Sequence, residues 1–433
     1  MHGIQVFAEN GNWLIEDQSD TTEILTTHPY PLFTPHCNQD PINTIRNGLH
    51  ATAESRLYGD IGGKPCMVEE IGTLGPMICS DAVSAEYAKM SMMSSYANDC
   101  RSFIWWCAYD QDHLTHAPYD WYAVERELGI FRKDRTKKPL AGAFREFGNF
   151  LKKVPKLPAM EKEAVCILTE SQDNWGAAYA TYILAKQAGF DIEFQDSNQP
   201  LKKSSLYLLP SLCGGSSMKR RKWEELLGKV KEGAHLYISC NDALLSPFGK
   251  MTGLEVSTRE KRSAPFRYSF EFAKDIEFVG SDAKFKLNLK TSGAKVLGRE
   301  ADGNPCFAVN KLGKGMVYFL SIPIETSLSS TPGAFHQNGA LPYWKVYEHF
   351  AKPFTSGRIL KKDDPFIAVT EHPEGKNAKI IFLINYSPEE RQTAIGLKSP
   401  WKVKQVLYGN LSTGKNGMTK VPANDALVFK AVK

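Results

Sequence analysis

Two adjacent glutamates, with a histidine and a tyrosine earlier in the chain, are the residues whose types and positions could carry catalysis. Glu69 and Glu70 end a strand-like run that starts at Lys64, and His28 and Tyr30 end the strand-like run before it. A carboxylate at the tip of a short buried strand has the character of a catalytic nucleophile. Glu70 is therefore the residue that most needs an explanation.

Short apolar strands alternate with helical stretches from residue 1 to about 155, and this alternation predicts repeated βα units. The predicted strands are residues 4–8, 23–27, 65–68 and 103–108. Capping residues, first-turn prolines and apolar residues at helical spacing predict helices after Asp40-Pro41, from Ser80-Asp81 and after Lys138-Pro139. Four βα units are half of an eight-fold barrel, whose chemistry lies at the C-terminal ends of its strands.

All four predicted strands carry polar or aromatic residues at their C-terminal ends. These residues are Asn10, Asn12 and Trp13 after the first strand, His28 and Tyr30 after the second, Glu69 and Glu70 after the third, and Tyr109, Asp110 and Gln111 after the fourth. Any one of them can be a hydrogen-bonded polar cap on its strand. The same pattern on every strand favours a functional site at this end of the units.

The rest of the chain divides into two further regions. A domain boundary is expected at residues 154–158, where two prolines close together cannot continue a helix. Residues 160–355 alternate strands and helices as a doubly wound, flavodoxin-like parallel sheet does, with a β-rich insertion expected near residues 255–300. Residues 356–433 consist of short strands separated by turn residues, which predicts a small β-sandwich.

Three motifs resemble the clan A glycoside hydrolases, which are retaining enzymes on (β/α)8 TIM barrels. His28-Pro29-Tyr30, residues 64–72 and residues 103–106 look like the sixth, seventh and eighth strands of such barrels, and residues 127–134 resemble the stretch that closes them. The order of barrel, doubly wound domain and sandwich resembles the family 42 β-galactosidases and similar β-mannosidases. The resemblance implies that residues 1–155 are the C-terminal half of an α/β barrel with strands five to eight. It also implies a β-galactoside or β-mannoside substrate and a trimerisation-type middle domain, hence a possible homotrimer.

The resemblance also assigns roles around Glu70. The clan motif places the nucleophile directly before an aromatic or aliphatic residue and glycine, which selects Glu70, and strand alternation is expected to turn Glu69 away from the pocket. Glu70 would attack the anomeric carbon and form a glycosyl-enzyme intermediate. Tyr30 matches the position that donates a hydrogen bond to the nucleophile, and His28 would shape the same wall. A core aromatic near the barrel rim is the alternative for Tyr30.

Further substrate contacts are expected from aromatic and amide side chains. Trp105 and Trp106 are neighbours on one strand and point to opposite faces, so one of them lines the pocket and the other packs in the core. Trp106 is the favoured pocket residue, where its flat face would cover the C–H surface of the sugar. Asn12 and Trp13 are the expected rim residues.

The second carboxyl of a retaining hydrolase is missing from the expected positions. This acid/base group stands about 5 to 5.5 Å from the nucleophile, and in the clan it is a Glu that follows an Asn on the fourth strand. No Asn-Glu precedes Glu70, and Glu9-Asn10 has the reverse order. The first four strands are therefore expected to be absent. A truncated or mis-started gene product is the favoured explanation; complementation by a separate N-terminal half and loss of catalysis are the alternatives.

Composition and the remaining motifs exclude several classes of function. A net charge of +5 spread over 433 residues gives no footprint for nucleic acid, and the absence of a long apolar run or signal pattern predicts a cytoplasmic protein without membrane partners. Nine cysteines without CxxC pairs, and His113 and His116 without a third ligand, predict no metal. The glycine-containing residues 213–217 lack a nucleotide motif, so no cofactor is expected. A non-catalytic carbohydrate-binding or assembly protein is the alternative function.

Overall fold

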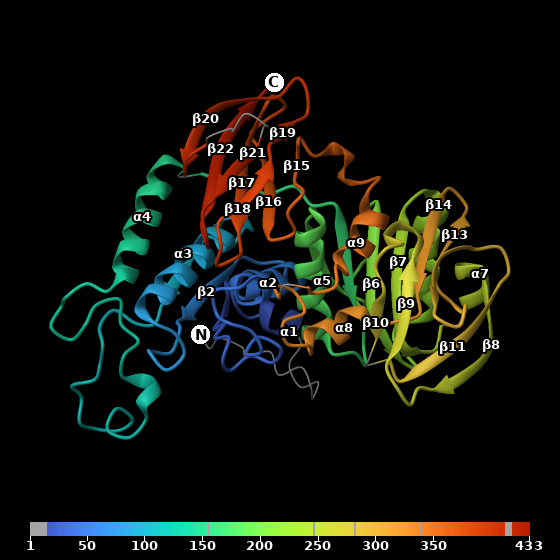
Figure 1. Cartoon of the computed structure of the whole chain (residues 1–433), viewed down its shortest axis with the longest axis horizontal. Coiled ribbons are helices and arrows are strands. Elements are labelled where there is room, and N and C mark those ends of the chain that lie inside the picture. The colour runs from blue at the N-terminus through green and yellow to red at the C-terminus, as the bar shows by residue number, and fades with distance from the viewer. Residues whose placement is uncertain (1–14, 155, 246, 281–282, 338, 412–417) are drawn as a thin grey trace. The chain divides into compact units, whose positions relative to one another are not determined.

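A computed structural model describes residues 15–154, 156–245, 247–280, 283–337, 339–411 and 418–433 (Figure 1). The strand predicted at residues 4–8 and the candidates Glu9, Asn10, Asn12 and Trp13 lie outside these residues. The described chain forms two compact units, one of residues 15–161 with Gly357–Lys433 and one of Lys162–Ser356. The three-domain division stays a prediction.

The N-terminal part of the first unit contains a parallel sheet of three strands in the order β1-β2-β3. Its elements are α1 Ile15–Ser19, β1 Leu25–Thr27, α2 Ile45–Gly62, β2 Cys66–Ile71, α3 Asp81–Ala97, β3 Phe103–Trp105, the 3-10 turn η2 Ala123–Glu125 and α4 Pro139–Lys153. Strand-helix alternation with parallel pairing is the βα arrangement that the apolar pattern predicts. The sheet brings the C-terminal ends of its strands to one edge.

Local signals place two of the helix starts correctly, and a third is wrong. Ser80 accepts the backbone N–H of Val83 ahead of α3, and Pro139 is the first residue of α4. The helix predicted after Asp40-Pro41 instead begins at Ile45. The Asp40 carboxylate accepts a hydrogen bond from Arg46 Nε at 2.5 Å. The Asp40 backbone carbonyl accepts one from the Asn47 side-chain amide at 2.8 Å. These bonds hold residues 40–44 as a turn, so Asp40 does not cap the helix.

The second unit is built on a nine-stranded mixed sheet in the order β10-β9-β12-β13-β14-β7-β6-β4-β5. The elements are β4 Ala164–Leu168, α5 Asn174–Ala188, β5 Ile192–Asp196, β6 Leu206–Gly214, α6 Arg220–Glu232, β7 His235–Ala243, α7 Phe248–Thr252, β8 Leu254–Lys261, β9 Phe266–Phe270, η3 Glu271–Ala273, β10 Phe278–Gly280, β11 Phe285–Thr291, β12 Lys295–Glu300, β13 Pro305–Leu312, β14 Gly315–Leu320, α8 Ile324–Ser329, α9 Trp344–Ala351 and η4 Thr355–Gly357.

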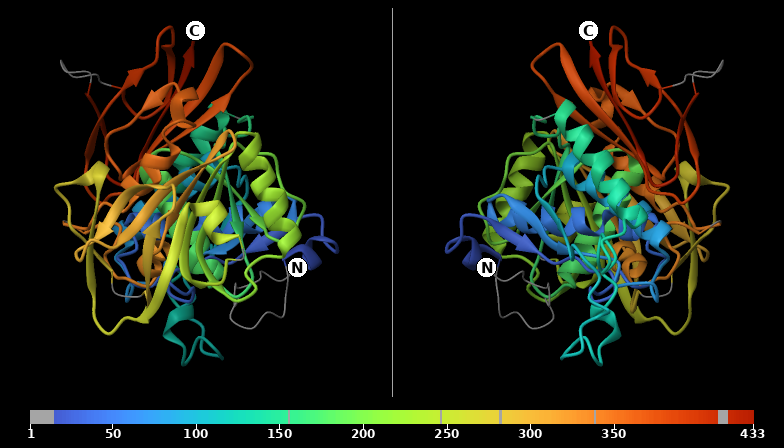
Figure 2. Two further views of the ribbon diagram at one scale, coloured as in Figure 1. Left: turned by 90° about the vertical axis from the view of Figure 1, so that its right-hand side faces the viewer. Right: turned by 90° about the vertical axis from the view of Figure 1, so that its left-hand side faces the viewer.

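The parallel strands of this unit run β14-β7-β6-β4-β5, the order of a flavodoxin-like sheet. Continuous apolar runs such as β6 are buried on both faces, as parallel strands between helices are. The β-rich segment predicted near residues 255–300 adds the antiparallel edge strands β9, β10 and β12. It also forms the β8–β11 ribbon, which lies outside the main sheet beside α7 (Figure 1; Figure 2).

The C-terminal part of the first unit is made of antiparallel strands. They are β15 Leu360–Lys361, β16 Ile367–Pro373, β17 Ala378–Asn385, β18 Arg391–Ala394, β19 Gly396–Leu397, β20 Lys402–Tyr408, β21 Met418–Val421 and β22 Ala426–Val432. A four-stranded sheet β16-β17-β22-β20 and two short pairs enclose one apolar core. Tyr386 of this part donates to Ser94 of α3 at 2.7 Å, and the Phe382 ring packs on those of Tyr96 and Phe150. Shared packing explains why these segments form one unit.

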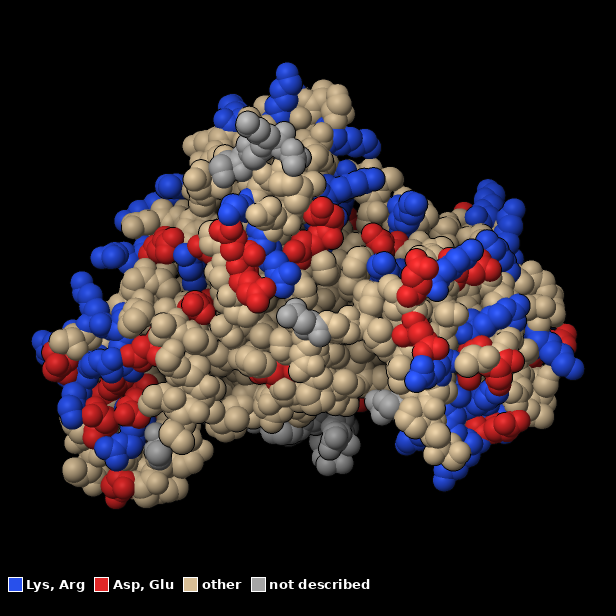
Figure 3. Space-filling model, in the orientation of Figure 1, with Lys and Arg blue, Asp and Glu red and all other residues tan. Residues whose placement is uncertain are grey.

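Acidic and basic side chains are interspersed over the face of the protein shown in Figure 3. Within the described ranges, no helix has the length and apolar character needed to cross a bilayer.

Candidate active site

The candidate nucleophile lies at the C-terminal end of β2, where a tyrosine from the preceding βα connection holds it. The Tyr30 hydroxyl donates a hydrogen bond to Glu70 Oε1 at 2.8 Å. The Tyr30 ring is buried among Leu74 and Leu128 and lies edge-on to Phe33. The Glu70 side chain keeps 29% of its surface exposed. A buried, fixed donor thus binds a carboxylate that still faces solvent.

Burial, followed by the negative charge of Glu70, raises the pKa of Tyr30 far above its ordinary value. The phenol therefore keeps its proton at every pH at which the protein is expected to work. A neutral hydroxyl in this place donates to the carboxylate, so Tyr30 binds Oε1 of Glu70 and leaves Oε2 without a hydrogen bond from the phenol.

His28 contacts both glutamates, which corrects the prediction that Glu69 turns away. His28 Nε2 lies 3.4 Å from Glu69 Oε2, and His28 Nδ1 lies 3.8 Å from Glu70 Oε2. The reason is a shift of register between β2 and β3: Val68 pairs with Phe103, but Ile71 pairs with Trp105. The extra residue in β2 breaks the strict alternation of faces that a regular strand would impose.

The two tryptophans of the third motif occupy different environments. Trp105 is 6% exposed, donates its indole N–H to the Leu128 carbonyl and packs edge-on against Tyr87 and Phe144. Trp106 is 39% exposed, and its backbone N–H donates to the carbonyl of Ile71, the residue after Glu70, at 2.8 Å. Trp105 is therefore the core residue of the pair. The backbone of Trp106 is hydrogen-bonded to the residue that follows Glu70.

Glycine is required directly after Ile71 because the two loops approach closely. A Cβ atom on Gly72 would lie 2.9 Å from the Trp106 carbonyl oxygen and 3.5 Å from the Tyr30 ring. The peptide bond between Trp106 and Cys107 is cis. The glycine of the motif thus serves the contact between the loop that follows Glu70 and the segment that carries Trp106.

Asp110 anchors the long loop that follows β3 and was predicted only as a polar residue at a strand end. Its Oδ1 accepts the Lys138 ammonium at 2.6 Å and the Gly129 N–H at 2.9 Å, and both charged side chains are only 5% exposed. The pair ties the start of the loop to the residue before α4. No spacing rule connects positions 110 and 138, so sequence reasoning missed this partnership.

The structure therefore brings together His28, Tyr30, Glu69 and Glu70. The backbone of Trp106 joins this group through its hydrogen bond to Ile71. Asn12 cannot be placed, because it lies outside the described residues. Among the residues that are described, no group of three or more His, Cys, Asp or Glu side chains is arranged to hold a metal ion. A partly exposed carboxylate held by a phenol can attack an electrophilic carbon in a bound ring.

Comparison with known proteins identifies the fold. No family model and no curated protein matches the chain. A catalytic mutant of Gan42B, a GH42 beta-galactosidase from G. stearothermophilus, matches all of this chain with 11% identity and a TM-score of 0.71. The exo-beta-1,4-mannosidase Op5Man5 from Opitutaceae bacterium strain TAV5 matches 76% of it, with 16% identity and a TM-score of 0.58. Alpha-L-fucosidase isoenzyme 2 from Paenibacillus thiaminolyticus matches 89%, with 13% identity and a TM-score of 0.58.

The chain spans 63%, 59% and 63% of the lengths of these three proteins, respectively. The TM-scores show that the folds are similar. Identities of 11 to 16% leave the substrate of this chain open, and the names of the three proteins include different sugars. In fold, this chain resembles the family 42 β-galactosidases and a β-mannosidase, and it has a glycoside hydrolase-like architecture.

Proposed function

We propose that the protein is a retaining glycoside hydrolase that cleaves β-linked galactosides or mannosides, with Glu70 as its nucleophile. The observation that carries this proposal is the 2.8 Å hydrogen bond from buried Tyr30 to Glu70 at the C-terminal end of β2. In barrel-derived enzymes this end of the strands is where substrates bind. The names of the structural neighbours supply the sugar class.

In the proposed reaction, the Glu70 oxygen that Tyr30 does not occupy attacks the anomeric carbon. The bond from that carbon to the leaving oxygen breaks as a glycosyl ester forms on Glu70. The leaving oxygen takes its proton from solvent water, because the chain has no acid/base carboxyl at the expected position, and the second step returns a proton to the solvent. Water then attacks the same carbon and releases the sugar and the carboxylate. Tyr30 keeps the carboxylate oriented through both steps, because its hydroxyl is buried and burial raises its pKa.

Trp106 and His28 are the proposed substrate-binding groups, together with Asn12. The exposed Trp106 indole offers a flat apolar face for the C–H side of the sugar ring. The distances of 3.4 Å from His28 to Glu69 and 3.8 Å from His28 to Glu70 support a role for His28 in binding a sugar hydroxyl next to the nucleophile. These roles can be tested separately from that of Glu70, because substitutions of these residues should affect binding of the sugar more than formation of the glycosyl ester.

The nucleophile is tested with the 2,4-dinitrophenyl 2-deoxy-2-fluoro-β-glycosides of galactose and mannose. Their leaving group, 2,4-dinitrophenolate, departs without a proton. We expect covalent labelling of the wild type and of Glu69→Gln, and no labelling of Glu70→Gln. Azide is expected to restore turnover of 2,4-dinitrophenyl glycosides to Glu70→Ala and to give the α-glycosyl azide. An unlabelled wild type, or a labelled Glu70→Gln variant, contradicts the assignment.

A second candidate function is carbohydrate binding or assembly without turnover. It is favoured by the β1-β2-β3 sheet, since the described residues of this region form three parallel strands and no closed barrel. This candidate requires galactose or mannose to bind by calorimetry while every dinitrophenyl glycoside stays intact. A homotrimer is proposed under either function, and light scattering coupled to size-exclusion chromatography measures it.

A further inference from the structure

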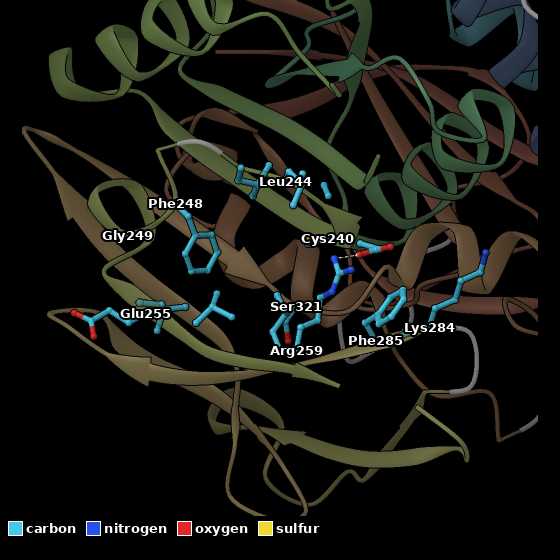
Figure 4. Close-up of a pocket in the computed structure, with 16 residues that line it drawn as sticks. Cys240, Leu244, Phe248, Gly249, Glu255, Arg259, Lys284, Phe285 and Ser321 are labelled. Carbon is cyan, nitrogen blue, oxygen red and sulfur yellow. Dashed lines mark hydrogen bonds and ion pairs between the residues drawn. The ribbon is translucent and has the colours of Figure 1, made fainter. Parts of the chain in front are cut away.

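The second unit contains a cavity of about 630 Å³ at the C-terminal end of β7 (Figure 4). Its walls come from the end of β7, from α7 and from the β8–β11 ribbon. Cavities of about 300 to 1,000 Å³ are the usual size for small-molecule sites. The cavity lies at the carboxyl end of a parallel strand and away from the β4–β6 switch point, where sheets of this order usually bind their ligands. The cavity therefore has the size of a ligand site, and all its lining residues lie within Lys162–Ser356.

The body of the cavity is apolar. Phe248, Leu254, Val256 and Leu287 line it, and the Phe248 ring is fixed from behind by an edge-on contact with Phe319 at 5.1 Å. Val256 keeps 44% of its surface exposed, so apolar surface stays open to a ligand. Burial of such surface is the main favourable term when a small apolar group binds.

Arg259 is the polar group at the centre of this lining (Figure 4). Its Nη1 forms an ion pair with Asp242, and its guanidinium carbon lies 4.5 Å from the centroid of the Phe285 ring. In the part of the chain that the structure describes, Nη2 and Nε of Arg259 have no partner. A stacked and tethered guanidinium with free N–H groups on one edge can bind a carboxylate or sulfonate through two parallel hydrogen bonds.

Arg259 is the basic group whose guanidinium lies among the other lining residues of the cavity (Figure 4). Lys284 also lines the cavity beside Phe285, but its ammonium is directed away from the other lining residues (Figure 4). Glu255 lies on the opposite side with its carboxylate directed away from the other lining residues (Figure 4). A ligand with a negative group at one end and an apolar body therefore matches the site in both chemistry and direction.

We propose that this cavity binds a small amphipathic anion, with one carboxylate or sulfonate on Arg259 and an apolar, ring-containing body against Val256, Leu254 and Leu287. The site is separate from Glu70 and independent of the function proposed above. Asp242 would set its affinity, because it competes with the ligand for the same guanidinium.

The probes are 8-anilinonaphthalene-1-sulfonate and its uncharged counterpart N-phenyl-1-naphthylamine, titrated against the full chain by fluorescence. We expect one sulfonate per chain, bound about tenfold more weakly by Arg259→Gln, as loss of a charged hydrogen bond predicts. The uncharged dye should bind equally to both proteins. Asp242→Asn should bind the sulfonate more tightly, and Asn suits this position because Asp242 has a φ of 57°.

Two further variants decide between this site and general dye binding. Arg267→Gln is the matched control, since Arg267 lies on β9, pairs with Glu277 and does not line the cavity. It should bind both dyes as the wild type does, while Val256→Asp should lose both. Undiminished sulfonate binding by Arg259→Gln or Val256→Asp overturns the proposal. If circular dichroism shows that Arg259→Gln is unfolded, Asp242→Asn decides, and unchanged or weaker sulfonate binding overturns the proposal.

Discussion

Tyr30 and Glu70 lie 40 positions apart in the chain and meet in a 2.8 Å hydrogen bond, with the phenol buried and the carboxylate partly exposed. Tyr30→Phe removes this bond and keeps the buried ring. A hydrogen bond to a charged group contributes about 1.5 to 3 kcal/mol, so we expect kcat for 2,4-dinitrophenyl glycosides to fall by about 10- to 100-fold.

Tyr109→Phe is the matched control for this measurement, because its side chain is exposed and lies on the loop after β3. It should leave kcat unchanged. Equal kcat values for Tyr30→Phe and the wild type would show that the bond does not serve the nucleophile.

The neighbouring tryptophans should respond to substitution in opposite ways. Trp105→Ala empties a packed position between Tyr87 and Phe144, and we expect it to lower the free energy of unfolding by about 3 to 5 kcal/mol. Trp106→Ala should lower that free energy by less than Trp105→Ala does, because Trp106 is 39% exposed and Trp105 is 6% exposed. It should instead raise KM for the glycoside.

Urea unfolding and steady-state kinetics on both tryptophan variants separate these effects. If Trp106→Ala unfolds more easily and binds substrate normally, Trp106 is a packing residue and the proposed sugar contact is wrong.

The loop after β3 depends on a buried charge pair. Asp110→Asn leaves the Lys138 ammonium buried with its carboxylate partner gone, and we expect a loss of about 3 kcal/mol in the free energy of unfolding. Asp112→Asn on the same loop is the control. Its pair with Lys133 is exposed, and such pairs contribute about 0 to 1 kcal/mol. Similar losses in the two variants, measured by urea unfolding, would contradict the anchoring role of Asp110.

Local sequence signals predicted much of this fold. Ser80 and Pro139 place two helix starts because capping and first-turn proline act within a few residues. The buried parallel strands of the second unit follow from their continuous apolar runs. The same local logic failed at Asp40-Pro41, since Arg46 and Asn47 take up the groups that would have capped a helix there.

The candidate site depends on contacts that no local pattern encodes. Period-two alternation predicted that Glu69 faces away from Glu70, but the register shift between Val68 and Ile71 brings both to His28. That shift arises from pairing with β3, which is distant in sequence. The Asp110–Lys138 pair likewise forms only when the loop closes. Residue types could therefore be predicted from the sequence, and their partners required the three-dimensional structure.

Buried tyrosines make the protein sensitive to alkaline pH. In the second unit, burial and then the charge of Glu325 raise the pKa values of Tyr237 and Tyr347, whose hydroxyls donate to that carboxylate at 2.9 and 2.8 Å. An unfolded tyrosine releases its proton near pH 10, about the ordinary pKa. Because the folded state retains the proton, this stability is present below about pH 10 and is lost as the pH rises toward the folded pKa.

Tyr347→Phe tests this linkage, because phenylalanine has no proton to lose. It should lower the free energy of unfolding by about 1 to 2 kcal/mol at neutral pH through the lost hydrogen bond. Between about pH 9 and 11, its stability should fall less steeply than that of the wild type. Tyr109→Phe removes an exposed hydroxyl and is the control for the loss of a phenol. The free energy of unfolding is measured with urea at each pH. If it falls equally steeply with pH in Tyr347→Phe and in the wild type, the pKa of Tyr347 does not differ between the folded and unfolded states.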